Sequence, residues 1–231
     1  NPDREIEESA TKILLVSSKK HEIKRVNRTK DEKQILLKKL SNSEIIFKSQ
    51  IQEKQNKAKE LEEKIRKIIA EEIAKTKKKK IKYNLTPESL ALSKEFKNNE
   101  GKLPWPVEKG VIVSRYGKQK HIVFQSVETF NNGIDIATNK NTDVRSVFDG
   151  IVSRIFFIKG EGKAVLINHG EYFSVYSGLK KVSVKAGERI FLKEKIGVVI
   201  THEEENTTEL HFEIWKGYDK KNPSKWLYDA D

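Results

Sequence analysis

The chain has 231 residues, of which 36% are hydrophobic and 35% are charged, and its formal net charge is +12. So high a charged fraction excludes a single compact globule, and we expect part of the chain to be extended and solvated. The sequence contains no cysteine, which excludes disulfides, thiolate zinc sites and cysteine nucleophiles. No run approaches the roughly 18 apolar residues that a membrane-spanning helix needs.

Most of the positive excess lies in the first third of the chain and in the run KTKKKKIK, residues 75–82. Lysines alternate there with glutamates along a helical pattern, which is typical of a solvated helix face followed by a basic linker. No recognised nucleic-acid module and no interleaved aromatic residues are present, so we expect no nucleic-acid partner. The charge favours attraction to an acidic protein, to anionic lipid headgroups or to the anionic cell-wall polymer.

Residues 4–79 contain neither proline nor glycine, and their abundance of Lys, Glu, Gln, Leu and Ile predicts one long helix. A heptad register through this helix places Ile23, Leu37, Ile51, Ala58 and Ile65 at one core position, and Val26, Leu40, Phe47, Leu61 and Ile68 at the other. Charged residues also fall on this seam, which indicates a discontinuous coiled coil. An arm of about 70 helical residues, roughly 100 Å long, cannot bury its apolar stripe alone and must pair with another helix.

The pattern changes after this arm. The stretch LTPESLALSKEF, residues 85–96, predicts a short amphipathic helix with Thr86 as N-cap and Pro87 at its first position. From Val111 onward, short apolar runs have a period of two and are separated by glycine and asparagine turns, which predicts an antiparallel β-sandwich or open barrel. We therefore predict an α+β chain with a coiled-coil arm over residues 1–80, a linker with a short amphipathic helix over 81–104, and a β domain over 105–231.

The β segment contains the collinear pieces SRYGKQKH, NNGIDIAT, VFDGIV, GKAVLINHGEYFSVYSGL, VKAGERI, IG and ELHFEIW. Through these pieces it resembles the LytM-type, lysostaphin-like zinc metallopeptidase domain that cleaves peptidoglycan cross-bridges. A basic helical coil that leads through a short helix and LPWPVEKG into such a domain is similar to the murein hydrolase activators of the EnvC type. In that group the LytM-like domain does not cleave, and it switches on N-acetylmuramoyl-L-alanine amidases during cell separation.

The resemblance also implies where the chemistry would lie. Active members bind zinc through a histidine and an aspartate in H-x-x-x-D and through the second histidine of H-x-H, and two further histidines activate the attacking water. In this sequence the three ligand positions hold Asn131, Asp135 and His211, and the helper positions hold Gly178 and Glu209. A neutral amide is a poor replacement for imidazole on zinc, and glycine can neither polarise water nor stabilise an oxyanion. We therefore expect no bound zinc, no other cofactor and no hydrolysis.

Two alternatives remain open at the level of sequence. Glu209 and His211 are two residues apart on a predicted strand and share a face, so with Asp135 they would form a two-carboxylate, one-histidine metal site of a weakly active zinc endopeptidase. If no metal binds, Glu209 instead hydrogen-bonds or ion-pairs with His211 in an empty polar groove. In the second alternative function the protein is a wall-binding scaffold, whose basic surface holds peptidoglycan and whose coil sets its distance from the membrane.

The resemblance further implies that the degenerate groove receives a helix of a peptidoglycan amidase. Its candidate residues are Asn131, Asp135, Tyr176, Gly178, Glu209 and His211, with Tyr116 and His121 at the rim. The helical segment before the domain is expected to shield this groove through Leu85, Leu90, Leu92 and Phe96, in the manner of a helix bound in a groove.

The same resemblance implies release of this shield by an FtsE–FtsX-type membrane complex that acts on the coiled coil, with peptidoglycan as a further partner. It also implies a periplasmic location. The chain contains no methionine and no visible signal peptide, so we expect this N-terminus to be a processed one.

Overall fold

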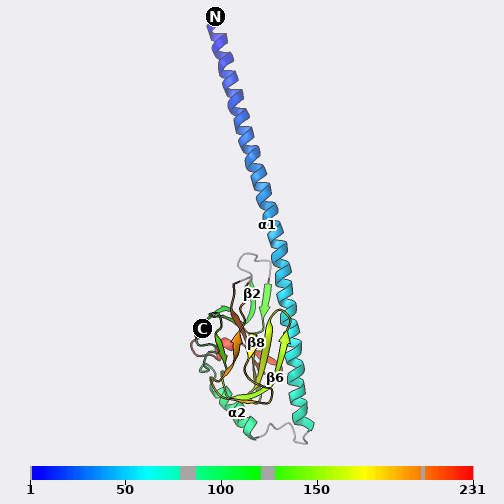
Figure 1. The fold of residues 1–231 in the computed structure, drawn as a ribbon. Helices are drawn as coiled ribbons and strands as arrows, with labels where there is room; N and C mark the ends of the chain where they lie inside the picture. The colour runs from blue at the N-terminus through cyan, green and yellow to red at the C-terminus, as the bar shows by residue number, and fades with distance from the viewer. Residues whose placement is uncertain (1, 79–86, 121–127, 204–205, 231) are drawn as a thin grey trace. The chain divides into compact units, whose positions relative to one another are not determined.

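The computed structural model describes residues 2–78, 87–120, 128–203 and 206–230 (Figure 1). Helix α1 (Pro2–Lys78) accounts for the predicted arm, and its length follows from the absence of any helix-breaking residue between Pro2 and Pro87. The chain divides into two units, Asn1–Gln52 and Glu53–Asp231. The boundary therefore falls inside α1, about 28 residues before the end predicted for the arm.

The first unit consists of α1 up to Gln52. Exposed pairs one turn apart, such as Arg28 with Glu32 at 3.0 Å, lie along its surface. Its large apolar side chains are also exposed, by 43% to 66%: Leu15, Val16, Ile23, Val26, Ile35, Leu36, Leu37, Leu40, Ile45, Ile46 and Phe47. Several of them are the residues that the heptad register assigns to the core of a coiled coil. No described helix is both long and apolar enough to cross a membrane.

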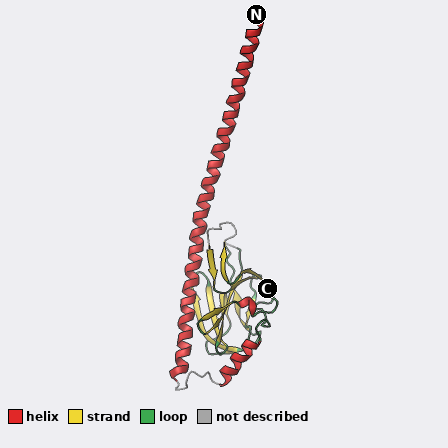
Figure 2. Ribbon diagram, turned by 180° about the vertical axis from the view of Figure 1, so that it is seen from behind, coloured by secondary structure: helices red, strands yellow, loops and turns green. Residues whose placement is uncertain are grey.

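The second unit begins with the last part of α1, which runs alongside the sheet in both ribbon views (Figures 1 and 2). Helix α2 (Pro87–Asn98) follows and begins at the predicted proline. The strands are β1 (Val111–Ser114), β2 (Gly117–Lys120), β3 (Glu128–Asn131), β4 (Ile134–Ala137), β5 (Asp143–Arg145), β6 (Gly150–Ile158), β7 (Gly162–Asn168), β8 (Tyr172–Val182), β9 (Arg189–Ile190), β10 (Lys195–Val199), β11 (Glu209–Lys216) and β12 (Asp219–Lys221), and a short 3₁₀ helix, η1 (Pro223–Lys225), ends the fold.

Ten of these strands form one antiparallel sheet, and β2 pairs with β3 in a small second sheet. The main path runs β1-β4-β11-β8-β7-β6-β9, while β10 bridges β5 to β8 and β12 extends β11. The path has two free ends, β1 and β9, so the described strands form no closed barrel. The predicted fold class, a long helix followed by an antiparallel β domain, is confirmed.

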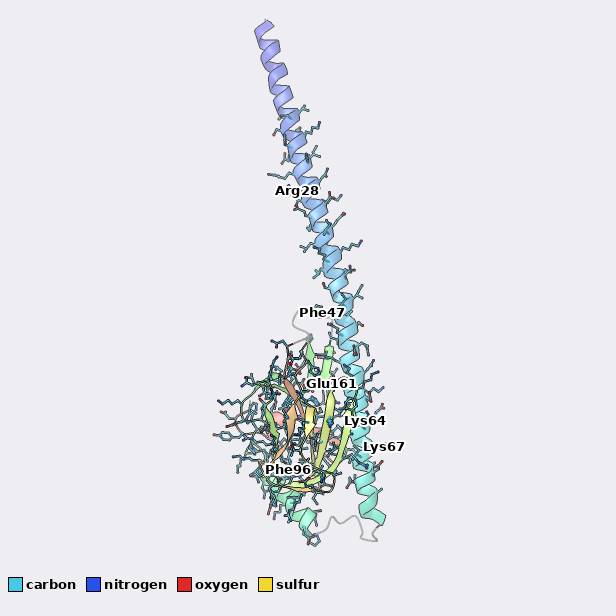
Figure 3. All side chains as sticks on the ribbon, viewed as in Figure 1. Arg28, Phe47, Lys64, Lys67, Phe96 and Glu161 are labelled. Atoms are coloured by element: carbon cyan, nitrogen blue, oxygen red, sulfur yellow. The ribbon has the colours of Figure 1, made fainter. Side chains whose placement is uncertain are left out.

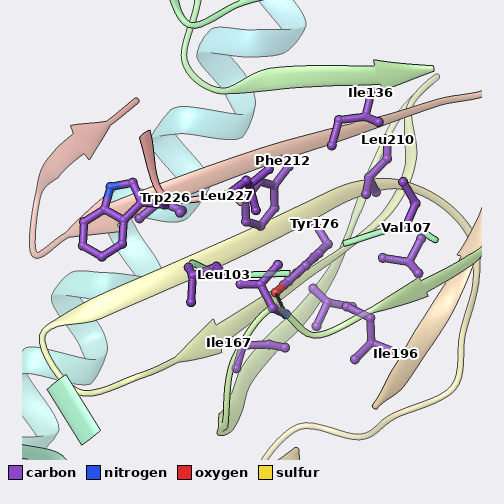
Figure 4. Packing of buried hydrophobic residues seen from close by; sticks show 14 of the residues in the cluster. Leu103, Val107, Ile136, Ile167, Tyr176, Ile196, Leu210, Phe212, Trp226 and Leu227 are labelled. Atoms are coloured by element: carbon purple, nitrogen blue, oxygen red, sulfur yellow. Dashed lines mark hydrogen bonds between the residues drawn. The ribbon is translucent and has the colours of Figure 1, made fainter. Parts of the chain in front are cut away.

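One face of the sheet packs into the main core. Leu210, Phe212 and Ile214 of β11 point to this side, together with Tyr176 of β8 (Figure 4). Helix α2 closes the same core, because its Phe96 is fully buried and stacks on Tyr172, with ring centroids 5.0 Å apart. Trp226, beyond η1, packs against the same ring of Phe96.

The opposite face of the sheet carries a second apolar cluster, which we call the α1 seat. It joins Leu61, Ile65, Ile68 and Ile69 of α1 to Ile158, Ala164, Leu166, Phe173, Val175 and Trp215 of strands β6, β7, β8 and β11. Strand side chains alternate between faces, so residues of one strand serve both clusters. Lys64, beside this stripe, donates to the carbonyl of Phe157 at 3.2 Å and pairs with Glu60 at 2.7 Å (Figure 3).

Candidate functional site

The candidate site lies where strands β3, β4 and β11 meet. Asp135 of β4 and His211 of β11 are directly paired across the antiparallel ladder. Such pairing holds their Cβ atoms about 5 Å apart, and the two side chains meet with His211 Nδ1 at 2.6 Å from Asp135 Oδ1. Both side chains are partly open to solvent, 23% for His211 and 27% for Asp135. Of the three zinc-ligand positions predicted from the resemblance, the structure thus brings together the two that hold residues able to bind zinc, Asp135 and His211.

Asn131, at the end of β3, completes the group with its amide. The amide nitrogen donates to Asp135 Oδ2 at 2.9 Å and to Ser114 Oγ at 2.8 Å. The amide oxygen accepts from the backbone N–H of Gly133 at 3.0 Å. Asn131 therefore presents hydrogen-bond donors, not a lone pair, to the centre of the site.

A buried carboxylate supports His211 from behind. Nε2 of His211 lies 2.8 Å from Glu213 Oε1, and the Trp215 indole donates to Glu213 Oε2 at 2.5 Å. Glu213 and Trp215 are fully buried. These residues follow His211 at two-residue steps on β11, so the period of the strand places all three on one face.

The charges of the site stabilise one another. Burial opposes the charge on His211, but Asp135 and Glu213 outweigh it and raise the pKa of His211 to about 10. Burial likewise acts to raise the pKa of Asp135, but the His211 charge and the Ser114 hydrogen bond lower it overall. At neutral pH the protonated ring of His211 lies between the carboxyl groups of Asp135 and Glu213, and these three residues form a triplet.

The donor set does not fit a catalytic zinc ion. Such a site needs about three protein ligands and one open position, whereas Asn131 directs its NH₂ group at Asp135. Within the described residues, no three His, Cys, Asp or Glu side chains are grouped to hold a metal ion. The alternative set of Asp135, Glu209 and His211 is thus not assembled as a metal site. The carboxylate on His211 Nε2 is Glu213.

The helper position at Gly178 is constrained by its backbone. Gly178 has φ +82°, in the left-handed region that side chains rarely adopt. A Cβ atom there would lie 2.9 Å from the carbonyl oxygen of Glu209 on the neighbouring strand. The backbone conformation at position 178 and the nearby Glu209 carbonyl therefore disfavour any residue with a side chain, including the histidine expected there from the resemblance.

Helix α1 reaches the edge of the site through polar contacts. Glu62 pairs with Lys220 of β12 at 2.8 Å and accepts from Asn132 Nδ2 at 3.3 Å. Lys220 also donates to Asn132 Oδ1 at 2.8 Å, and its side chain is 16% exposed. Arg66, one turn after Glu62 and paired with it at 2.9 Å, lies over the Trp215 ring at 5.4 Å from its centroid. These contacts link α1 to the strand that carries His211.

Other predicted groove residues lie elsewhere. Tyr176 is fully buried in the main core, where its hydroxyl accepts from the backbone N–H of Val147 at 3.0 Å, so it does not line the groove (Figure 4). The reason is its register, since Tyr176 and Phe212 pair on the core side of β8 and β11. Tyr116 is partly buried against Phe130, at a centroid distance of 6.0 Å. His121 lies outside the described residues.

The predicted shielding helix also differs from the structure. Phe96 belongs to the main core, and Leu90 is 48% exposed. Leu92 lines a pocket with Ile151 and Arg154. Leu85 lies outside the described residues. The apolar face that packs on the site's side of the sheet comes from α1, at Leu61, Ile65, Ile68 and Ile69, so α2 closes the core and α1 covers the sheet.

The sequence interpretation missed Glu213, Trp215, Ser114, Asn132, Lys220 and Glu62. The first two could have been found, because they continue the two-residue period from His211. The other four come from β1, the β3–β4 turn, β12 and α1, and only the folded topology brings them together.

Residues 129–223 match Peptidase family M23. Among curated proteins, the chain is similar to an uncharacterized metalloprotease of Buchnera aphidicola, with 31% identity over 86 residues, which are 37% of this chain and 23% of that protein. It is also similar to murein hydrolase activator EnvC of Escherichia coli, with 28% identity over 128 residues. These residues are 55% of this chain and 29% of that protein. Among solved structures, a zinc containing peptidase from Vibrio cholerae is 27% identical with a TM-score of 0.46, over 56% of this chain and 41% of that one.

The matches span less than a third of the length of these two curated relatives. The match to the family begins at β3 and ends at η1, and it includes the strands that carry Asn131, Asp135 and His211. The LytM-type recognition made from sequence is confirmed. The C-terminal part of this chain, over residues 129–223, is a Peptidase family M23 domain.

Proposed function

We propose that this protein is a non-catalytic activator of a peptidoglycan amidase and acts in the cell envelope during daughter-cell separation. The single observation that carries the proposal is Asn131 at a zinc-ligand position, with its amide NH₂ directed at Asp135. A site built in this way has lost the Lewis acid that peptide hydrolysis in this family requires. The similarity to murein hydrolase activator EnvC supports the activating role.

We place the partner surface on the face of the sheet that α1 covers. His211, Glu213 and Trp215 share this face, and the α1 seat begins at Trp215. A partner helix with an aliphatic stripe would bind there by the same helix-in-groove packing that α1 uses. In this proposal α1, and not the segment of Leu85 to Phe96, shields the surface.

We propose a second partner-binding surface on the part of α1 that forms the first unit of the chain. Its exposed apolar side chains, interleaved with charged residues, suit pairing with another helix. The resemblance implies that an FtsE–FtsX-type membrane complex binds this region, and we propose that this binding draws α1 away from the sheet. Because α1 is one continuous helix, a force on its first unit would act directly on Leu61 to Ile69.

The test is release of labelled fragments from purified peptidoglycan by the organism's own wall amidase. Reactions contain the amidase alone, the amidase with this protein, and this protein alone. We expect stimulation in the mixed reaction and no release by this protein alone. Release by this protein alone would favour the endopeptidase alternative, and absence of stimulation together with retention on peptidoglycan would favour the scaffold.

A further inference from the structure

We propose that the Asn131 amide takes the place of the metal ion, so that Asn131, Asp135 and His211 form a metal-free, hydrogen-bonded site in which a single substitution at position 131 restores zinc binding. This inference goes beyond the activating role, since it concerns what the site itself holds. It does not depend on any amidase.

The orientation of the Asn131 amide is fixed by three hydrogen bonds. The nitrogen has two acceptors, Asp135 Oδ2 at 2.9 Å and Ser114 Oγ at 2.8 Å, and the oxygen has one donor, the N–H of Gly133 at 3.0 Å. Rotating the amide by 180° would set its oxygen against the Asp135 carboxylate and its NH₂ against the Gly133 N–H. Both contacts would be repulsive, so the one metal-binding atom of Asn131 stays turned away.

Both oxygens of Asp135 are occupied by protein donors. Oδ2 accepts from Asn131, and Oδ1 lies 2.6 Å from His211 Nδ1. In a zinc site these lone pairs would face the cation. The amide and the imidazole together provide the positive electrostatic environment that the metal would otherwise supply to the carboxylate, and each of them occupies one oxygen of Asp135.

The support that a metal-bound histidine needs is still present. A zinc-ligating histidine usually gives its other ring N–H to a carboxylate, and Glu213 Oε1 lies 2.8 Å from His211 Nε2. Glu213 is itself held by the Trp215 indole at 2.5 Å and is fully buried. Asp135, His211 and their supporting residues therefore remain in place, and the missing part is the ligand at position 131.

It follows that Asn131→His should rebuild zinc binding. A histidine at this position starts from the same backbone, at the end of β3, from which the amide already reaches Asp135. Hydrolysis should not return with the metal, because Gly178 has φ +82° and no room for a Cβ beside the Glu209 carbonyl. Metal binding and activity are thereby separated in one variant.

The experiment titrates Zn²⁺ by calorimetry and Co²⁺ by visible absorption into the full chain. The proteins are the wild type, Asn131→His, Asn131→Gln as a matched control, and Asn131→His combined with His211→Ala. We expect one Zn²⁺ per chain and the intense absorption of tetrahedral Co²⁺ in Asn131→His alone, with affinity at least ~100-fold above that of the wild type. Adding Glu213→Gln to Asn131→His should weaken binding by about 10- to 100-fold.

Three outcomes overturn the proposal. The first is stoichiometric zinc in the wild type, and the second is a folded Asn131→His variant that binds no zinc. The third is equal binding after His211→Ala, which would place the ion elsewhere. Circular dichroism of each variant verifies folding, and if Asn131→His does not fold, Asn131→Asp offers a second ligand at the same position, from which we expect weaker but stoichiometric binding. None of these readouts involves an amidase, so failure here is distinct from failure of the proposed function.

Discussion

Among the single residues, His211 holds together two carboxylates that would otherwise repel each other. Its ring lies between Asp135 and Glu213 at 2.6 and 2.8 Å, and Glu213 has no exposure to solvent. A buried carboxylate without a partner costs much more than the pair itself contributes, since its hydration is lost without compensation. The stability of this face of the sheet therefore depends on one imidazolium.

Replacing His211 by Gln should destabilise the domain by about 3 kcal/mol, because Glu213 would lose its charged partner. Urea unfolding at pH 7 measures the effect. The double variant His211→Gln with Glu213→Gln should recover part of the loss, because no uncompensated charge then remains. Equal stability of wild type and His211→Gln would show that the triplet contributes nothing.

The same residue makes stability depend on alkaline pH. The pKa of His211 is raised from 6.5 to about 10 in the folded protein, mainly by Asp135 and Glu213 acting against burial. Its contribution is thus fully present below pH about 6.5 and is lost as the pH rises toward 10. The melting temperature should fall between pH 7 and pH 10 in the wild type and fall less in His211→Gln. Parallel pH profiles for the two proteins would contradict the charge assignment.

His169 has the opposite dependence. It is fully buried, with Nδ1 at 2.6 Å from the Asp149 carbonyl and Nε2 at 2.7 Å from Ser174 Oγ. Burial lowers its pKa from 6.5 to about 4, so its contribution to stability is lost as the pH falls from about 6.5 toward 4. Nuclear magnetic resonance should find its ring unprotonated at pH 5.5. A titration midpoint near 6.5 would show that the ring is not buried in solution.

Among the elements, the two helices of the second unit have different roles. The ring of Phe96 on α2 stacks on His169 at 4.8 Å and packs against Trp226 at 5.1 Å, so α2 is part of the main core. The stripe of α1 packs on the outer face of the sheet and is reinforced by the Glu62–Lys220 pair. Removal of α1 would expose an apolar face and leave the main core intact, whereas removal of α2 would open that core.

Phe96→Ala should therefore cost about 3–5 kcal/mol in the unfolding of the whole domain. Leu90→Ala, on the exposed side of the same helix, should cost less than about 0.5 kcal/mol. Both values come from urea denaturation followed by near-ultraviolet circular dichroism. A small effect of Phe96→Ala would restore α2 as a removable shield, as the sequence interpretation had it.

Elements and site were predictable from the sequence to different degrees. The long helix and the strands follow from local patterns, namely an unbroken run of helix formers and a period of two. The placement of Asn131, Asp135 and His211 at one site was implied by the resemblance to the LytM-type domain. The core position of Tyr176 could not be predicted, because β8 has register shifts that change which residues share a face.

The packing of α1 on the sheet could not be predicted from the sequence either, for a different reason. Leu61, Ile65 and Ile68 fit the heptad seam of a coiled coil, and an aliphatic stripe suits a helix partner and a sheet face equally well. Sequence periodicity shows that a face is apolar but not what covers it. The polar contacts that distinguish the two cases, Glu62 with Lys220 and Asn132, join residues at least 70 positions apart.

At the scale of the whole molecule, the chain joins an M23 domain to a helix that covers the sheet face proposed to bind the partner, and the described residues of that domain group no three His, Cys, Asp or Glu side chains for a metal ion. The chain contains no cysteine, and so no disulfide fixes α1 to the sheet. The covered state is held by apolar packing and by a few charged contacts. A partner that binds the seat must displace α1, so the affinity of the partner is reduced by the free energy of docking.

The measurement that tests this account most directly compares amidase stimulation by the wild type with that by a variant whose α1 cannot dock. Ile65→Asp with Ile69→Asp places two charges in the α1 seat, where both side chains are fully buried. Leu36→Asp with Leu40→Asp is the matched control on the exposed part of α1. Sedimentation checks that each variant has the same oligomeric state as the wild type. The account predicts stronger stimulation by the first variant, about 10-fold for each 1.4 kcal/mol of docking energy removed, and an unchanged value for the control. Equal or weaker stimulation by a folded Ile65→Asp/Ile69→Asp variant would contradict it.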